Sequence, residues 1–109
     1  MAALPLQIDV QSLHASLQAA EAPFLLDVRE PWEFEICALP GAVNLPMGEV
    51  PGRLDELPRD RPIVVICHHG MRSLQVTNFL RARGFDQAQN LAGGVDSWAQ
   101  QVDFAMPRY

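Results

Sequence analysis

The chain contains no lysine, and its eight basic residues are all arginine. Thirteen acidic residues outnumber them, so the formal net charge is −5, and no basic stripe is present that could bind nucleic acid. Low-complexity tracts, charge runs, internal repeats and linkers are also absent. A chain of 109 residues without a linker is long enough for one domain and too short for two. We therefore expect a single domain over residues 1–109.

Cysteine is scarce, because Cys37 and Cys67 are the two in the chain and do not make a disulfide framework. The first residues lack the basic start and long apolar stretch of a signal peptide, and no later run is long enough to span a bilayer. We therefore expect a cytoplasmic protein with no membrane contact. Reducing conditions there would keep Cys67 available as a thiol.

Short apolar runs alternate with helical patterns along the chain. Strands are expected at residues 7–8, 24–28, 42–45, 63–66 and 87–91. Helices are expected from Asp9 or Ser12 to about Ala20, and at residues 30–34, 49–57, 72–83 and 95–101. The apolar face of the helix at 72–83 would be Leu74, Val76, Phe79 and Leu80. This order predicts an α/β fold with a central, mostly parallel five-stranded sheet flanked by helices.

Cys67 follows the β-branched run at residues 63–66, which is typical of a buried parallel strand. It opens a loop that leads into the helix at residues 72–83. At such a turn backbone N–H groups converge and the helix dipole is positive, which stabilises a thiolate, the reactive form of cysteine. Ligands of parallel sheets bind at the carboxyl ends of strands, where Asp27 also lies. We predict that Cys67 is a nucleophile at this edge.

The residues after Cys67 have the types needed to hold an anion. Amides from His68 to Arg72 could wrap around the sulfur, and Gly70 permits a backbone that other residues avoid. Arg72 adds a planar cation suited to oxyanions, and Ser73 could cap the helix or donate a hydrogen bond. Two chemistries fit this arrangement: attack on the outer sulfur of an anionic donor, or attack on phosphorus.

Five segments of the chain resemble those of single-domain rhodaneses and follow one another in the order found in that family. The segment from Cys67 to Ser73 is similar to the family's active-site loop, Cys-x-x-Gly-x-Arg-Ser. The others are Leu26-Asp27-Val28-Arg29-Glu30, Trp32-Glu33-Phe34, the run from Leu39 to Pro46, and Gly84-Phe85 followed by Leu91-Ala92-Gly93-Gly94 and Trp98. Where the family has Gly-His before its Pro-Gly-Ala segment, this chain has Cys37-Ala38. The substitution removes a local contact and introduces a second thiol.

The resemblance implies a three-layer rhodanese-like domain that transfers sulfur without a cofactor. Cys67 would take sulfane sulfur from thiosulfate or a persulfide donor, become a persulfide, and pass the sulfur to cyanide or a thiol, with ping-pong kinetics. The residues implied to bind the donor are His68, His69, Gly70, Met71, Arg72 and Ser73. A second interpretation is a persulfide carrier that serves a protein partner in a sulfur relay. A third is a phosphatase or arsenate reductase, although those relatives carry Cys-x5-Arg and this chain carries Cys-x4-Arg.

Several residues keep two interpretations at this stage. His68 and His69 either shape the pocket mouth or ligate a metal, and their adjacency favours the former, so no metal site is expected. Arg72, at a helix start, needs an anionic ligand or a carboxylate such as Asp27. Asp27 and Arg29 form an ion pair or line the pocket rim. Cys37 is a buried thiol or a resolving cysteine for Cys67. We expect four aromatic residues to belong to the core: Trp32, Trp98, Phe79 and Phe85. Gly93-Gly94 is expected to form a turn rather than a phosphate site.

Overall fold

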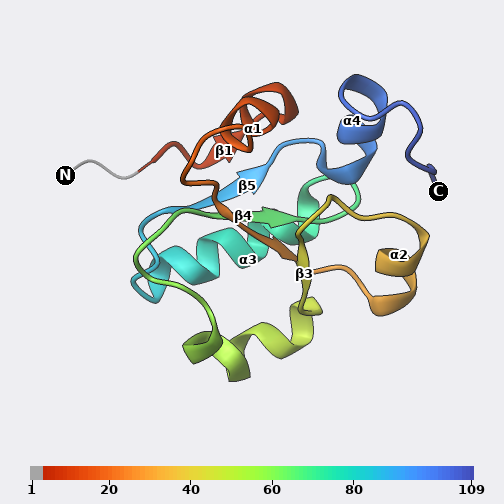
Figure 1. The fold of residues 1–109 in the computed structure, drawn as a ribbon. Coiled ribbons are helices and arrows are strands. Elements are labelled where there is room, and N and C mark those ends of the chain that lie inside the picture. The colour runs from red at the N-terminus through yellow and green to blue at the C-terminus, as the bar shows by residue number, and fades with distance from the viewer. Residues whose placement is uncertain (1–3) are drawn as a thin grey trace.

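The computed structural model describes residues 4–109, and in it strands and helices alternate throughout (Figure 1). The strands are β1 (Gln7–Ile8), β2 (Phe24–Asp27), β3 (Val43–Asn44), β4 (Ile63–Ile66) and β5 (Ala88–Leu91). The helices are α1 (Val10–Ser16), α2 (Pro31–Ile36), the 3₁₀ helix η1 (Met47–Glu56), α3 (Met71–Ala82) and α4 (Gly94–Gln101). Within the described residues, no helix has the length and apolar character needed to cross a membrane.

The five strands form one sheet in the order β1-β5-β4-β2-β3, and every neighbouring pair is parallel. This confirms the predicted α/β class. The register sets Asp27 beside Ile66 and Val65 beside Asn90. The carboxyl ends of β2, β4 and β5 therefore lie next to one another, and Cys67 follows the middle one of the three.

Each face of the sheet has its own hydrophobic core, and the two cores separate along β4. Val64 and Ile66 point into the core under α1 and α4, whereas Ile63, Val65 and Cys67 point into the core under α3 and η1. Figure 1 shows these two helical layers on opposite sides of the strands. The alternation of side chains along a strand thus places the Cys67 thiol on the α3 side.

Most expected elements are confirmed, but two helices differ from the expectation. The first helix begins after Asp9, whose carboxylate accepts a hydrogen bond from the Ser12 amide at 2.7 Å. It ends at Ser16 rather than near Ala20, because the Gln18 amide bonds to the Ala15 carbonyl in a tightened last turn. The helix expected at residues 49–57 is a 3₁₀ helix, kinked at Arg53, with Pro51 inside it.

The buried face of α3 is more polar than the apolar pattern predicted. Val76 and Leu80 are buried, as expected, but Ser73 and Thr77 are fully buried on the same helix while Leu74 and Phe79 are half-buried. The reason is that the first turn of α3 faces the Cys67 loop rather than hydrocarbon. Among the aromatic residues assigned to the core, Trp98 and Phe85 are buried, whereas Trp32 is 60% exposed and the assignment to the core was wrong.

Candidate active site around Cys67

The Cys67 sulfur lies at the start of the loop of residues 67–72, here called the Cys67 loop. The residue is 1% exposed. The Gly70 amide donates a hydrogen bond to Sγ at 3.0 Å, and the Ser73 hydroxyl lies 3.1 Å from the same sulfur. A backbone amide and a hydroxyl from the first turn of α3 therefore meet at the Cys67 sulfur.

Gly70 is required by the path of the loop. Its φ is +104°, a left-handed conformation that L side chains rarely adopt. A Cβ at this position would lie 3.2 Å from the Gly93 nitrogen and 3.4 Å from the Leu91 carbonyl oxygen. Only glycine both takes this turn and allows the Cys67 loop to approach the end of β5.

The first turn of α4 fixes the other side of the Cys67 loop. The Val95 amide donates to the Cys67 carbonyl at 2.9 Å, and the Asp96 amide donates to the His68 carbonyl at 3.1 Å. In a trans peptide the N–H points opposite to the C=O. The His68 and His69 amides, which share peptide planes with these two carbonyls, therefore point away from α4.

Gly94 makes this contact between α4 and the loop possible. A Cβ on Gly94 would overlap the carbonyl oxygens of Cys67 and His68. The Gly93-Gly94 turn thus has a structural role, and the first amides of α4 bind loop carbonyls. This agrees with the turn that we expected, rather than with a phosphate site.

Asn90, on β5, was not predicted as a site residue, but it is hydrogen-bonded to Ser73 and Gly70, the two residues that contact the Cys67 sulfur. It is 2% exposed. Its Nδ2 donates to the Gly70 carbonyl at 3.1 Å and to Gln7 Oε1 at 2.8 Å, and its Oδ1 accepts a hydrogen bond from the Ser73 hydroxyl. Asn90 therefore connects β5 to both groups that contact the Cys67 sulfur. The pattern of residues 87–91 predicted only a strand, and no local sequence feature identified Asn90 as part of the site.

The partner of Arg72 is a carboxylate, one of the two expected alternatives, but it is Glu33 on α2 and not Asp27, the example that we named. The two guanidinium nitrogens of Arg72 lie 2.7 and 2.9 Å from the two carboxylate oxygens of Glu33. The Arg72 hydrogen bond lowers the pKa of Glu33 to about 2, although burial opposes that shift. The same hydrogen bond raises the pKa of Arg72. This bidentate pair ties α2 to the start of α3.

Asp27 and Arg29 form the buried ion pair that the sequence left as one of two alternatives. Both side chains are 0% exposed, and Arg29 Nη2 lies 2.6 Å from Asp27 Oδ2. The prediction that they line an exposed pocket rim was therefore wrong. Arg29 Nη2 also donates to the Cys37 carbonyl at 2.6 Å. Burial lowers the pKa of Arg29, but the hydrogen bonds with Asp27 and Tyr109 outweigh burial and raise it.

The rings of Tyr109, His68 and His69 form a stack beside the Cys67 loop. The Tyr109 and His68 centroids are 3.9 Å apart at 9°, and those of His68 and His69 are 4.0 Å apart. The Tyr109 hydroxyl donates to Glu33 Oε2 at 2.7 Å and accepts from Arg29 Nη1 at 2.9 Å. Burial raises the pKa of Tyr109 to about 12. No local sequence feature identified Tyr109 as a neighbour of the Cys67 loop.

The two histidines lie at the edge of the loop, as the pocket-shaping interpretation requires. Burial lowers the pKa of His68, and the adjacent His69 lowers it further, so His68 is neutral at neutral pH. The His69 side chain is 62% exposed, and its Nδ1 lies 3.9 Å from Asp96. Met71 is 74% exposed and makes no part of the core.

Cys37 is separated from Cys67 by the sheet. Both cysteines are free and buried, but Cys37 belongs to the core under α1 and α4, on the other face from Cys67. Its Sγ is 3.9 Å from Arg29 Nη1. This placement matches a tolerated buried thiol and argues against a resolving cysteine.

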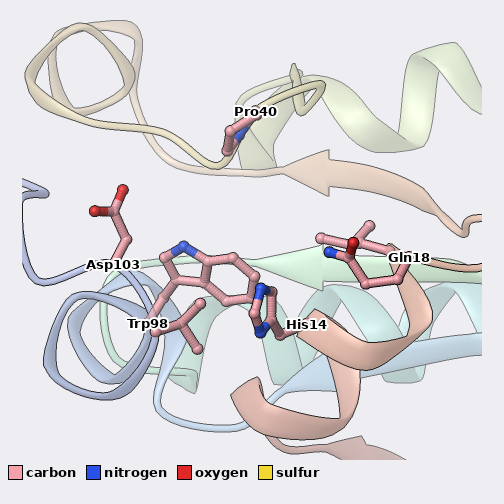
Figure 2. A pocket seen from close by; sticks show the side chains of 7 residues that line it. His14, Gln18, Pro40, Trp98 and Asp103 are labelled. Atoms are coloured by element: carbon pink, nitrogen blue, oxygen red, sulfur yellow. The ribbon is translucent and has the colours of Figure 1, made fainter.

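A surface pocket of about 470 Å³ lies away from the candidate site (Figure 2). It is lined by His14, Leu17, Gln18, Pro40, Trp98, Val102 and Asp103. His14 packs edge-on against Trp98, which belongs to the core opposite Cys67. The pocket thus contains no residue of the Cys67 loop.

Comparisons with known proteins point to one family. A family model described as a rhodanese-like domain matches residues 9–101. A sulfurtransferase of Allochromatium vinosum is 38% identical over 94 residues, which are 86% of this chain and 88% of that protein. The adenylyltransferase and sulfurtransferase MOCS3 of Drosophila virilis is 36% identical over 104 residues, which are 85% of this chain but 22% of that protein. The crystal structure of a rhodanese-related protein from Thermoplasma volcanium has a TM-score of 0.82 at 31% identity, and the match covers 90% of this chain and 94% of that one.

Proposed function

The chain belongs to the rhodanese-like family, and we propose that it is a sulfurtransferase that carries sulfane sulfur on Cys67. The observation that carries this proposal is the position of the Cys67 sulfur. It lies at the carboxyl end of the central strand, with the Gly70 amide and the Ser73 hydroxyl within hydrogen-bond distance. A thiol with these neighbours can become a nucleophile and can bear the charge of a persulfide.

The reaction has two half-reactions. In the first, the Cys67 thiolate attacks the outer sulfur of thiosulfate or of a persulfide. The new S–S bond forms as the donor's S–S bond breaks, and sulfite or a thiolate leaves with the electron pair. In the second, cyanide or a thiolate attacks the outer sulfur on Cys67, and the electron pair returns to the Cys67 thiolate. Neither step requires a cofactor for its atoms and electrons to balance.

The persulfide anion would be stabilised by dipoles rather than by net charge. The charged groups beside the Cys67 loop are held in ion pairs: Arg29 with Asp27, Arg72 with Glu33, and Arg108 with Asp96. The favourable electrostatic contribution would therefore come from the Gly70 amide, the N-terminus of the twelve-residue helix α3, and the His68 and His69 amides, which point away from α4. Arg72 keeps donors beyond the two used for Glu33, and with them it can orient an anionic donor at the loop.

A persulfide carrier is the second candidate. The chain matches part of a longer relative named both adenylyltransferase and sulfurtransferase, which suggests delivery of sulfur to a protein partner. In that case Cys67 would accept sulfur but would turn over cyanide slowly. We also propose a cytoplasmic location, because a reducing compartment keeps Cys37 and Cys67 as the free thiols found here.

Intact-mass measurement with and without thiosulfate tests the proposal. We expect an adduct of about 32 Da, one sulfur atom, on the parent protein and on the Cys37→Ser control, and its loss on adding a reductant. The Cys67→Ser variant should show no adduct. An adduct with rapid thiocyanate formation supports the enzyme, and an adduct with negligible turnover supports the carrier.

Two outcomes would overturn the proposal. One is a Cys67→Ser variant that converts thiosulfate and cyanide at the parental rate. The other is a parent protein that forms no adduct but hydrolyses an aryl phosphate or oxidises thiols in the presence of arsenate. The latter would support the phosphatase or arsenate reductase interpretation.

A further inference from the structure

The Ser73 hydroxyl lies between two groups that compete for its single hydrogen. Its oxygen is 3.1 Å from Cys67 Sγ and within hydrogen-bond distance of Asn90 Oδ1. A serine hydroxyl has one hydrogen to donate and two lone pairs that accept. Ser73 can therefore donate to the sulfur or to the amide oxygen, but not to both.

The orientation of the Asn90 amide is fixed by its other contacts. Its Nδ2 lies 3.1 Å from the Gly70 carbonyl oxygen, which can only accept. The Nδ2 group must therefore face Gly70, and Oδ1 must face Ser73. Because Oδ1 can only accept, the Ser73 hydrogen points to Asn90, and the Ser73 oxygen accepts the hydrogen of the Cys67 thiol.

Loss of the thiol proton changes this arrangement. Once Cys67 is a thiolate, both neighbours of the Ser73 hydroxyl are acceptors. Cys67, Ser73 and Asn90 are 1%, 0% and 2% exposed, so bulk water cannot supply a second donor. The hydroxyl must turn from Asn90 to the sulfur, which leaves Oδ1 without its donor.

We propose that Asn90 is a positioning residue that controls the thiolate through Ser73. By holding the Ser73 hydrogen, Asn90 favours the protonated thiol. By holding the Gly70 carbonyl, it keeps the Gly70 amide aimed at the sulfur in both states. The proposal rests on Cys67 being the nucleophile, and it adds a residue of β5 to the groups that set the reactivity of that nucleophile.

Other titratable groups surround the Cys67 loop, but their side chains, within residues 4–109, are not hydrogen-bonded to Ser73 or Asn90. All of these groups remain in the variants proposed below. From β2 and the residues after it, the loop, α2, α3, α4 and the C-terminal segment, these groups are Asp27, Arg29, His68, His69, Glu33, Arg72, Asp96, Arg108 and Tyr109.

Alkylation of Cys67 by iodoacetamide, followed against pH in the full chain and located by peptide mass, tests the proposal. Asn90→Ala removes the competing acceptor and should move the midpoint of the profile to lower pH. Asn90→Asp adds an acceptor and removes the donor to Gly70, so it should move the midpoint to higher pH. Near neutral pH we expect alkylation to be about three- to tenfold faster in Asn90→Ala and about three- to tenfold slower in Asn90→Asp than in the parent. Because the charge of the new carboxylate would itself raise the midpoint, the part of each shift that passes through Ser73 is the part that disappears when Ser73 is replaced.

The Ser73→Ala background separates action through Ser73 from action on the loop. There, Asn90→Ala should leave the midpoint unchanged, because no hydroxyl remains to be redirected. The same shift in both backgrounds, or no shift in either, would overturn the proposal. If Asn90→Ala fails to fold by circular dichroism, the near-isosteric Asn90→Asp decides alone, and a midpoint at or below the parental one contradicts the proposal. Alkylation needs no sulfur donor, so the alkylation profile can be interpreted even if the protein transfers no sulfur.

Discussion

Glu33 shows how one buried carboxylate fixes a cation at the Cys67 loop. Its side chain is 5% exposed, and it binds both terminal nitrogens of Arg72. A single arginine at the start of a helix is unfavourable, since the helix dipole is positive there. Glu33 compensates for that, and it holds the guanidinium in one place while a donor approaches. A carboxylate from a separate helix thus determines where the charge of the Cys67 loop lies.

We predict that Glu33→Gln lowers stability and changes its pH dependence. The folded protein holds the pKa of Glu33 at about 2, against an ordinary value of 4.5, which corresponds to roughly 3 kcal/mol at neutral pH. Arg72 is 37% exposed and partly screened, so we expect a loss of about 2 kcal/mol. This stabilisation is present above pH 4.5 and is lost as the pH falls towards 2. Urea unfolding at several pH values measures it.

Glu56→Gln is the matched control for that prediction. Glu56 also pairs with an arginine, Arg53, but on the surface, where both side chains are about half exposed. An exposed pair adds little, so this variant should lose much less stability than Glu33→Gln. If the two variants lost equal stability, or if the parent and Glu33→Gln curves stayed parallel below pH 4.5, the role given to Glu33 would be wrong.

At the scale of elements, α4 shapes the candidate site through its backbone, by binding two carbonyls of the Cys67 loop. Its first amides bind the Cys67 and His68 carbonyls, and this contact requires the glycine at the start of the helix. By holding those carbonyls, α4 turns the paired amides towards the other side of the loop. The position of α4 and the geometry of the Cys67 loop are therefore coupled.

We predict that Gly94→Ala moves α4 away from the Cys67 loop. The new methyl group would overlap the Cys67 and His68 carbonyls, so α4 must withdraw and at least one of its hydrogen bonds to the loop must break. We expect a loss of about 2 kcal/mol or more in urea unfolding, together with slower formation of the Cys67 persulfide. Gly52→Ala is the control, since nothing lies within 4 Å of its added Cβ. Persulfide formation at the parental rate in Gly94→Ala would show that the loop does not depend on α4.

The elements themselves were largely predictable, because their signals are local. The β-branched run at residues 63–66 and the alternation of strands and helices predicted a parallel sheet, which is present. The extent of the first helix and the polar buried face of α3 were not predictable, since hydrogen bonding in the last turn and the proximity of Ser73 to Cys67 depend on the final structure.

The same distinction applies to the candidate site. Cys67, Gly70 and Arg72 lie in one loop, so their spacing alone suggested that they work together. Glu33 lay inside a segment that resembles the family, but its pairing with Arg72 was not predicted, because pairing between α2 and α3 depends on how the two helices pack. Asn90 and Tyr109 lie far from the Cys67 loop in sequence, and only the folded chain brings Asn90 to Ser73 and Tyr109 to His68.

At the scale of the molecule, the C-terminal segment returns to the Cys67 loop. Figure 1 shows this end of the chain leaving α4 on the side of α2. Tyr109 then contacts three separate parts: its ring stacks on His68, and its hydroxyl bridges Arg29 and Glu33. One side chain thus joins the buried Arg29–Asp27 pair to the Glu33–Arg72 pair. We expect this connection to stabilise the loop and to keep His68 out of water.

We predict that Tyr109→Leu raises the pKa of His68 towards its ordinary value of 6.5, because removing the stacked ring exposes the imidazole. Tyr109→Phe keeps the ring and should leave that titration close to the parental one. Loss of the hydroxyl alone should lower stability by about 1 kcal/mol, and the leucine variant should lose about 1 kcal/mol more. Proton NMR titration of His68 and urea unfolding measure the two effects. If His68 titrated identically in the leucine and phenylalanine variants, the stack would not be what excludes water, and burial by the loop itself would account for the shifted pKa.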